Sequence, residues 1–244
     1  MSNNSLLDRI QSYENVSKIY LTRKIPVIIR IDGKAFHHFT SGFNRPFDKL
    51  FRTIMAETAK LLCENIQGCV FAYTQSDEVS LLVTDYAKIQ TEAWFNYNIQ
   101  KLTSISASMT TCYFNSLIRE NMKSADNPDQ MRFLETKLNK AIFDSRVFSI
   151  PKEDVINYFI YRQQDATRNS IESVGRIYFS HSELNRVTCN EIQDMLWKQH
   201  NINWNDFDIS FKRGVCCYRY LDKWIIDYEP PIFTQNREYI TKYI

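Results

Sequence analysis

The sequence predicts a mixed α+β fold, because its first 150 residues fit one known order of strands and helices. A β-branched run at 27–31 ends at Asp32 and Gly33, as a buried strand followed by a sharp turn does. Two further strands, within 69–84, share a polar tip at 75–77 and form a hairpin. With the helices between them, the order is β-α-β-β-α-β, which is that of a ferredoxin-like split βαβ unit.

The helices of this first part are predicted from apolar residues that recur every three or four positions. One helix is expected from 46 to about 65, and a longer one over about 92–117. The polar stretch 121–129 is expected to be a surface loop. A fourth strand covers 142–149 and is stopped by Pro151.

Pro151 marks a change in sequence character and therefore a soft domain boundary. We expect a sheet domain at 1–150 and a mostly helical extension at 151–244 packed on it. Helical patterns cover 152 to about 167, and a second helix is expected from about 169.

The rest of the extension is predicted to hold one capped helix and a terminal β-hairpin. Residues 188–200 form the helix, which begins with a capping box between Thr188 and Glu191. Residues 208–227 look like a hairpin or meander that turns at 212–214.

Composition narrows the class of protein. With 44% hydrophobic and 24% charged residues in 244, the chain is globular and not disordered. A net charge of +2 excludes a strongly basic nucleic-acid coat but allows a local basic face.

No apolar run approaches the roughly 18 residues of a membrane span, and residues 1–24 lack the features of a signal or transit peptide. The six cysteines match no metal-binding spacing and indicate reduced thiols, so we expect a cytoplasmic protein without a membrane partner.

The most informative pair of residues is Asp32 and Asp77. Strands one and three of a split βαβ sheet are usually central, adjacent and antiparallel, so the two carboxylates should meet at one sheet edge, with Glu78 beside them. Such hard oxygen ligands suit Mg²⁺ shared with substrate phosphates, and two ions about 3.5–4 Å apart could activate a hydroxyl and steady a leaving pyrophosphate. Gly33 allows the backbone to offer an amide or a carbonyl. Taken singly, each segment is more typical of an ordinary solvated turn, and only the topology that joins the two supports a site.

Cations for a triphosphate are present near this turn and on the second helix. Lys34 follows the turn, Arg45 precedes the first helix, and Lys101 lies on the second. In phosphoryl transfer the protein mainly positions groups and neutralises charge, so these residues are candidates for that role. Each of them could instead be a surface charge.

A polar segment at 162–170 lies between two helical patterns. Arg168 and Asn169 could reach a phosphate or a base edge, and Arg162 with Asp165 could orient them. The alternative is a solvated helix junction. We therefore take these four residues as candidate RNA-binding residues.

Together these motifs resemble the tRNA(His) guanylyltransferase superfamily over about residues 5–220. The segments that carry the resemblance are 30–37, 46–48, 72–78, 143–148 and 162–171. The resemblance implies a sheet like the palm of polymerases and nucleotide cyclases and a two-metal site. It also implies nucleotide addition to the 5′ end of RNA, in the 3′–5′ direction.

The resemblance also assigns roles to residues. Asp32, Asp77 and Glu78 are expected to be catalytic, and the metal ligands to be Asp32, Asp77 and the backbone carbonyl of Gly33. The expected nucleotide-binding residues are Gly33, Lys34, Ala35, Phe36, His37, Arg45, Asp48, Ser76 and Lys101. Asn98 stands where the family often has an arginine, which puts a triphosphate contact there in doubt.

A second departure indicates the branch of the family. Where the eukaryotic enzymes specific for tRNA(His) have His-Ile-Asn-Asn, this chain has Thr167-Arg168-Asn169-Ser170. This resembles the guanylyltransferase-like branch, whose members add nucleotides by Watson–Crick templating and repair 5′-truncated tRNAs.

The sequence thus predicts a nucleotidyltransferase that repairs tRNA 5′ ends by templated 3′–5′ addition. We expect two Mg²⁺ ions per site, GTP, ATP and other nucleoside triphosphates as substrates, and a homotetramer built as a dimer of dimers. The alternatives are a strict tRNA(His) guanylyltransferase that adds an extra 5′ G, a palm-fold nucleotide cyclase, and an inactive RNA-binding module. Retention of Asp32 and Asp77 argues against the last of these.

Overall fold

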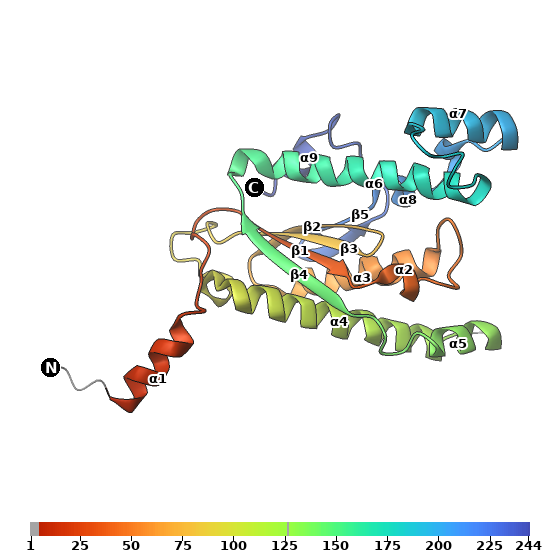
Figure 1. The fold of residues 1–244 in the computed structure, drawn as a ribbon. Helices are drawn as coiled ribbons and strands as arrows, with labels where there is room; N and C mark the ends of the chain where they lie inside the picture. The colour runs from red at the N-terminus through yellow and green to blue at the C-terminus, as the bar shows by residue number, and fades with distance from the viewer. Residues whose placement is uncertain (1–4, 126) are drawn as a thin grey trace.

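The strands of the described residues, 5–125 and 127–244, form one antiparallel sheet of six in the computed structural model (Figure 1). Their order across the sheet is β4-β1-β3-β2-β5-β6. The strands are β1 (Val27–Gly33), β2 (Cys69–Gln75), β3 (Glu78–Val83), β4 (Phe143–Ser149), β5 (Val215–Tyr220) and β6 (Lys223–Asp227). The predicted α+β class is confirmed, and β1 and β3 are adjacent and antiparallel as expected.

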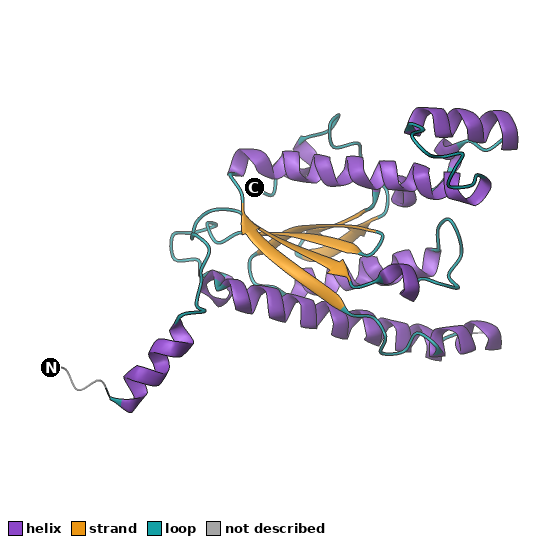
Figure 2. Cartoon of the chain, viewed as in Figure 1, coloured by secondary structure: helices purple, strands orange, loops and turns teal. Residues whose placement is uncertain are grey.

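Helices cover both faces of this sheet (Figure 2). The α-helices of the described residues are α1 (Leu6–Asn15), α2 (Phe36–Phe39), α3 (Lys49–Asn65), α4 (Ile99–Lys123), α5 (Pro128–Glu135), α6 (Val155–Tyr178), α7 (Cys189–His200), α8 (Ile209–Arg213) and α9 (Glu238–Thr241). α3 and α4 lie on one face and α6 lies on the other. The alternation of β1 explains this arrangement, because Ile29 and Ile31 pack in the cluster under α3 and α4 whereas Ile28 packs under α6. Within the described part of the chain, no helix is both long and apolar enough to span a bilayer.

The start and end of α4 differ from the sequence prediction. Positive φ angles at Phe95, Asn96 and Tyr97 interrupt the expected helix, and the Asn98 side chain caps the real one by accepting from the Lys101 amide. At its other end α4 continues to Lys123, so the predicted loop 121–129 is helical at both ends, since α5 begins at Pro128. Residue 126 of that predicted loop lies outside the described residues.

α6 is one continuous helix through the segment that was expected to be a junction. The segment 162–170 has no glycine or proline, and Asp165 accepts from both Arg162 and Arg168 one turn away on either side. The prediction of two helices separated by a polar junction is therefore wrong.

The C-terminal hairpin is confirmed, but its turn lies elsewhere. Residues 212–214 end α8, and the hairpin turns at Leu221 and Asp222, both with positive φ. Gly214, at φ 78°, passes so close to β2 that a Cβ would lie 2.7 Å from the Thr74 carbonyl oxygen. β5 pairs with β2, so the segment after residue 150 contributes two strands to the shared sheet. The predicted capping box of Thr188 and Glu191 is present at α7.

Candidate active site

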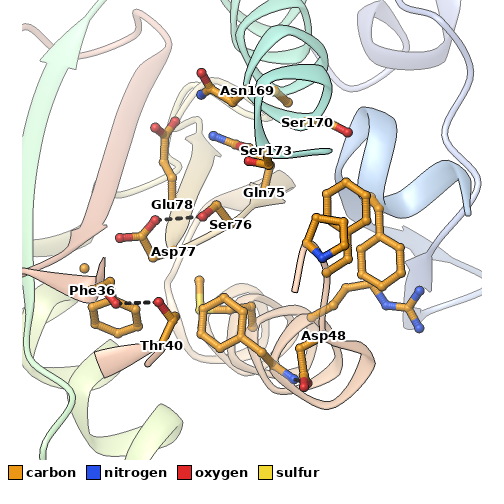
Figure 3. Close-up of a pocket in the computed structure, with 18 of the residues that line it drawn as sticks. Phe36, Thr40, Asp48, Gln75, Ser76, Asp77, Glu78, Asn169, Ser170 and Ser173 are labelled. Carbon is orange, nitrogen blue, oxygen red and sulfur yellow. Dashed lines mark hydrogen bonds between the residues drawn. The ribbon is translucent and has the colours of Figure 1, made fainter. Parts of the chain in front are cut away.

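A cavity of about 830 Å³ opens at the end of the sheet where β1 ends and the β2–β3 hairpin turns (Figure 3). Its walls come from β1, α2, the start of α3, the hairpin tip and α6. The residues predicted for the site that line it are Asp32, Gly33, Ala35, Phe36, His37, Arg45, Asp48, Ser76, Asp77, Glu78, Arg162, Asp165 and Asn169. Segments far apart in the chain are thus brought together as the split βαβ topology predicts.

Strand pairing holds Asp32 and Asp77 at the same end of the sheet. Asp32 is paired in register with Glu78, and the Gly33 amide donates to the Asp77 carbonyl oxygen at 3.2 Å. The Ser76 hydroxyl donates to the Asp77 carboxylate at 3.0 Å, which fixes the side chain at the tip (Figure 3). The positions of both carboxylates therefore follow from the backbone register.

The electrostatics of this tip favour a bound cation. Burial raises the pKa of the Asp77 carboxyl, the Ser76 hydroxyl opposes that rise, and the negative charges of Asp32 and Glu78 add to it. In the described part of the chain, no group of three or more His, Cys, Asp or Glu side chains could hold a metal. The donors at hand are two carboxylates and the Gly33 carbonyl, a hard oxygen set that suits Mg²⁺ completed by substrate oxygens.

Glu78 lies in a buried ion-pair network next to Asp77. Its carboxylate accepts from Arg162 Nε at 2.7 Å, from a terminal nitrogen of Arg162 at 2.5 Å, and from Arg30 at 2.6 Å. Glu78 and Arg162 are 4% and 3% exposed, so neither faces bulk solvent. This geometry gives Arg162 a positioning role, because it ties α6 to the strand that carries the hairpin tip. Asp165 in turn accepts from Arg162 at 3.1 Å.

Three predicted residues lie outside the cavity. Lys101 lies in the first turn of α4, ten residues before Thr111, which accepts from the Phe143 amide at the site end of the sheet. That separation is about 15 Å along the helix. Lys101 instead lines a second cavity of about 490 Å³ beside Lys18, with its amino group 5.6 Å from the Phe95 ring centre. Lys34 and Arg168 are exposed and do not line the main cavity either.

Sequence reasoning identified Asn169 but missed that the polar face of α6 continues along the cavity to Ser173 and Arg176. Asn169, Ser173 and Arg176 recur at helical spacing, and Figure 3 shows Asn169 and Ser173 from this wall of the cavity. The expected break near residue 168 hid this periodicity. Arg52 was also missed: it donates to the Ser210 hydroxyl at 2.7 Å and lies 4.8 Å from the Phe211 ring centre.

Buried Lys137 holds the loop that forms another wall. Its amino group donates to the carbonyl oxygens of Phe39 and Ser41, at 2.6 Å each, and lies 5.2 Å from the Phe133 ring centre. Desolvation lowers the pKa of Lys137. The contacts fix the end of α2 and the start of the loop that leads to Arg45, so a residue 92 positions further on shapes the cavity.

A pair of carboxylates at the end of an antiparallel α+β sheet, beside a cavity of this size, fits the class of enzymes that transfer phosphoryl or nucleotidyl groups with bound metal. Comparison with known proteins gives the family. Residues 7–151, more than half of the chain, match the family model described as tRNAHis guanylyltransferase. The chain therefore belongs to the tRNA(His) guanylyltransferase family, whose members are nucleotidyltransferases.

Solved structures and curated relatives agree with this family. The chain is similar to a bacterial tRNA(His) guanylyltransferase-like protein in complex with ATP, at 42% identity and a TM-score of 0.88 over 98% of this chain and 99% of that one. A bacterial protein of the same description in complex with GTP is 38% identical, with a TM-score of 0.80 over 98% and 99% of the two chains. The tRNA(His) guanylyltransferase of Debaryomyces hansenii is 27% identical over 80% of this chain and 74% of that protein.

The Glu78–Arg162 pair generates a stability prediction. Arg162→Met leaves buried Glu78 with Arg30 alone, so we expect the free energy of unfolding to fall by about 3 kcal/mol in urea denaturation. The matched control is Arg168→Met on the same helix, whose side chain is 59% exposed and pairs with Asp165. It should change stability by less than about 1 kcal/mol. Equal losses in the two variants would contradict the positioning role of Arg162.

Lys137 generates a prediction about the loop. In Lys137→Met the Phe39 and Ser41 carbonyls lose their donor, so we expect amide hydrogen exchange over residues 39–45 to quicken by about tenfold. Exposed Lys140 supplies the control as Lys140→Met. Unchanged exchange over 39–45 in Lys137→Met would show that the loop holds its shape without this contact.

Proposed function

We propose that this protein adds nucleotides to the 5′ end of tRNA in the 3′–5′ direction, templated by base pairing with the opposite strand. The observation that carries the proposal is the convergence of Asp32 and Asp77, through the register of β1 and β3, at a cavity of about 830 Å³. Identity of 42% to a bacterial guanylyltransferase-like protein, over nearly the whole chain, supports it.

Asp32, Asp77 and the Gly33 carbonyl are the residues that would hold Mg²⁺, with two ions per site. Bound metal would neutralise phosphate charge and favour ionisation of the attacking hydroxyl. Glu78 and Arg162 keep the hairpin tip in place, and Ser76 orients Asp77.

The proposed reaction has two steps on one site. An oxygen of the RNA 5′-monophosphate attacks the α-phosphorus of ATP, which forms a 5′-adenylylated end and releases pyrophosphate. The 3′-hydroxyl of GTP or another incoming nucleoside triphosphate then attacks the RNA 5′ phosphorus, which forms the new phosphodiester and releases AMP. The proposed nucleotide-binding residues that line the cavity are Gly33, Ala35, Phe36, His37, Arg45, Asp48 and Ser76.

Residues 167–170, which stand where the enzymes specific for tRNA(His) have His-Ile-Asn-Asn, favour templated addition over recognition of one tRNA. The Thr167 hydroxyl donates to the Lys212 carbonyl oxygen at 3.0 Å, and Ser170 accepts from the Trp204 indole at 3.0 Å. Two of the four motif positions thus serve packing contacts, which leaves Arg168 and Asn169 for RNA. Strict tRNA(His) guanylylation is the second candidate, because several curated relatives carry that name.

We also propose a homotetramer, and helix α1 supports it. α1 stands away from the body of the protein in Figure 1, and the structure shows no buried residue in it. Leu6, Ile10 and Tyr13, on one face of α1, are 67%, 45% and 68% exposed. A ten-residue helix is marginal alone in water, so this apolar face suits burial against a second copy. The cytoplasmic location stays a prediction from the cysteine composition.

Activity is tested on a tRNA transcript that lacks its first nucleotide and carries a 5′-monophosphate. With Mg²⁺, ATP and all four nucleoside triphosphates, the wild-type protein should restore the pairing nucleotide. Asp77→Asn removes a metal ligand at nearly constant volume and should lower the rate by at least about 100-fold. Addition of G to full-length tRNA(His) without a templating base would favour the strict enzyme. Extension of neither tRNA would rule out both functions.

The role of α1 is tested by mass photometry. Ile10→Glu places a charge on the exposed apolar face and should shift the mass from tetramer toward dimer or monomer. The control is Ile89→Glu, at a loop residue that is 83% exposed. A tetramer that survives Ile10→Glu, or one that both variants disrupt equally, would refute α1 as the interface.

A further inference from the structure

A strip of arginine and tyrosine side chains lies on the sheet face that α6 covers, along the flank next to β4. β4 is at one edge of the described sheet, and its Arg146 is 54% exposed. Arg146 pairs in register with Arg30, as Asp144 does with Asp32. Cross-strand partners share a face, so Arg146 lies on the same side of the sheet as the Asp32 carboxylate.

Arg146 is the loosely held cation of this group. Its guanidinium lies 3.9 Å from the Asp32 carboxylate and 3.3 Å from that of Asp144, and both carboxylates are themselves partly exposed. Arg162, in contrast, is engaged by buried Glu78, and Arg30 is held by Glu78 at 2.6 Å and by Asp32 at 3.6 Å. Arg146 is therefore close to the proposed metal ligand, exposed, and able to exchange its partners for a phosphate.

An exposed aromatic ring lies on the same flank. Tyr161 of α6 is 60% exposed, and the guanidinium carbon of Arg162 lies 5.2 Å from its ring centre. One turn earlier, Tyr158 contacts β4 directly, with its ring 5.8 Å from that of Phe148. Tyr161 thus lies beside the Glu78 network with most of its ring in solvent. A ring in this setting can stack on a nucleobase, an interaction worth about 1–3 kcal/mol per base.

We propose that Arg146 binds the 5′-phosphate of the RNA, that Tyr161 stacks on a base near that end, and that the RNA therefore enters from the β4 flank. The inference rests on the proposed function. A nucleotidyl transfer brings two phosphate-bearing substrates to one pair of carboxylates, and each of them needs its own phosphate-binding residues. The main cavity, between α2, α3 and α6, lies on one side of Asp32, and Arg146 lies on the other without lining that cavity. The guanidinium suits a terminal phosphate because it can donate two hydrogen bonds to it.

The test compares binding of two RNAs that differ only in their 5′ end. Fluorescence anisotropy is measured with truncated tRNA carrying a 5′-monophosphate or a 5′-hydroxyl, in Mg²⁺ and without nucleoside triphosphate, so no chemistry occurs. Arg146→Gln should weaken binding of the phosphorylated RNA by about tenfold and leave the hydroxyl RNA unchanged. The matched control is Arg219→Gln on β5, since Arg219 is 60% exposed and lies 3.3 Å from Asp222.

Tyr161 has a different expected signature. Stacking on a base does not depend on the 5′-phosphate, so Tyr161→Ala should weaken the binding of both RNAs equally, by about tenfold. Its control is Tyr220→Ala, at a hairpin tyrosine that is 62% exposed. Binding of GTP, followed with a fluorescent analogue, should be unchanged in all four variants.

Several outcomes would overturn the inference. If Arg146→Gln binds both RNAs as Arg219→Gln does, the 5′ end does not lie on this flank. If Arg146→Gln weakens GTP binding, Arg146 belongs to the triphosphate site. If either result is found with Arg146→Gln while the wild-type protein extends the truncated tRNA, only the proposed entry route is wrong. If it binds GTP but neither binds nor extends tRNA, the proposed function fails and the entry route fails with it.

Discussion

The buried ion pair between Glu78 on β3 and Arg162 on α6 is the contact on which the shape of the site depends. These residues are 84 positions apart and join the sheet to the helix that covers it. A buried pair contributes little net stability, because desolvation of both charges offsets their attraction, but breaking it leaves an unpaired charge. Here the Glu78 carboxylate accepts three short hydrogen bonds from two arginines, one of them on α6. Its charge is therefore fully compensated only when strand and helix keep this arrangement. The pair thereby specifies where α6 crosses the site end of the sheet.

Two walls of the cavity meet at this ion pair, one from the strands and one from α6. The register of β1 and β3 puts Asp32 opposite Glu78, and the next residue back, Asp77, then receives the Gly33 amide through its carbonyl oxygen. On the helix, Asn169 and Ser173 lie about two and three turns beyond Arg162 and face the same space. The strand register thus positions the proposed metal ligands, and the ion pair places the polar face of the helix beside them.

Much of this site could be predicted from local sequence, and the rest depended on contacts that local sequence does not encode. The strand at 27–31 and the hairpin have short, strong patterns, and the topology rule alone brings Asp32 to Asp77. The continuity of α6 was missed because polar residues at 162–170 look solvated until Glu78 is known to bury one of them. Lys101 was expected near the triphosphate as a cation on the second predicted helix and by family resemblance, whereas the structure places it in the first turn of α4, far from the site end of the sheet.

Burial also separates the arginines of this region by what they can do. Arg162 is committed to Glu78, and a phosphate could recruit it only by leaving a buried carboxylate unpaired, whereas Arg30 is shared between Glu78 and Asp32. Arg45, Arg146 and Arg168 have exposed side chains, so a phosphate can displace water or a partly solvated carboxylate at far lower free-energy cost. A chain with a net charge of +2 can therefore still bind an anionic polymer and a triphosphate, because a few exposed cations near two carboxylates suffice and a basic coat over the whole surface is not needed.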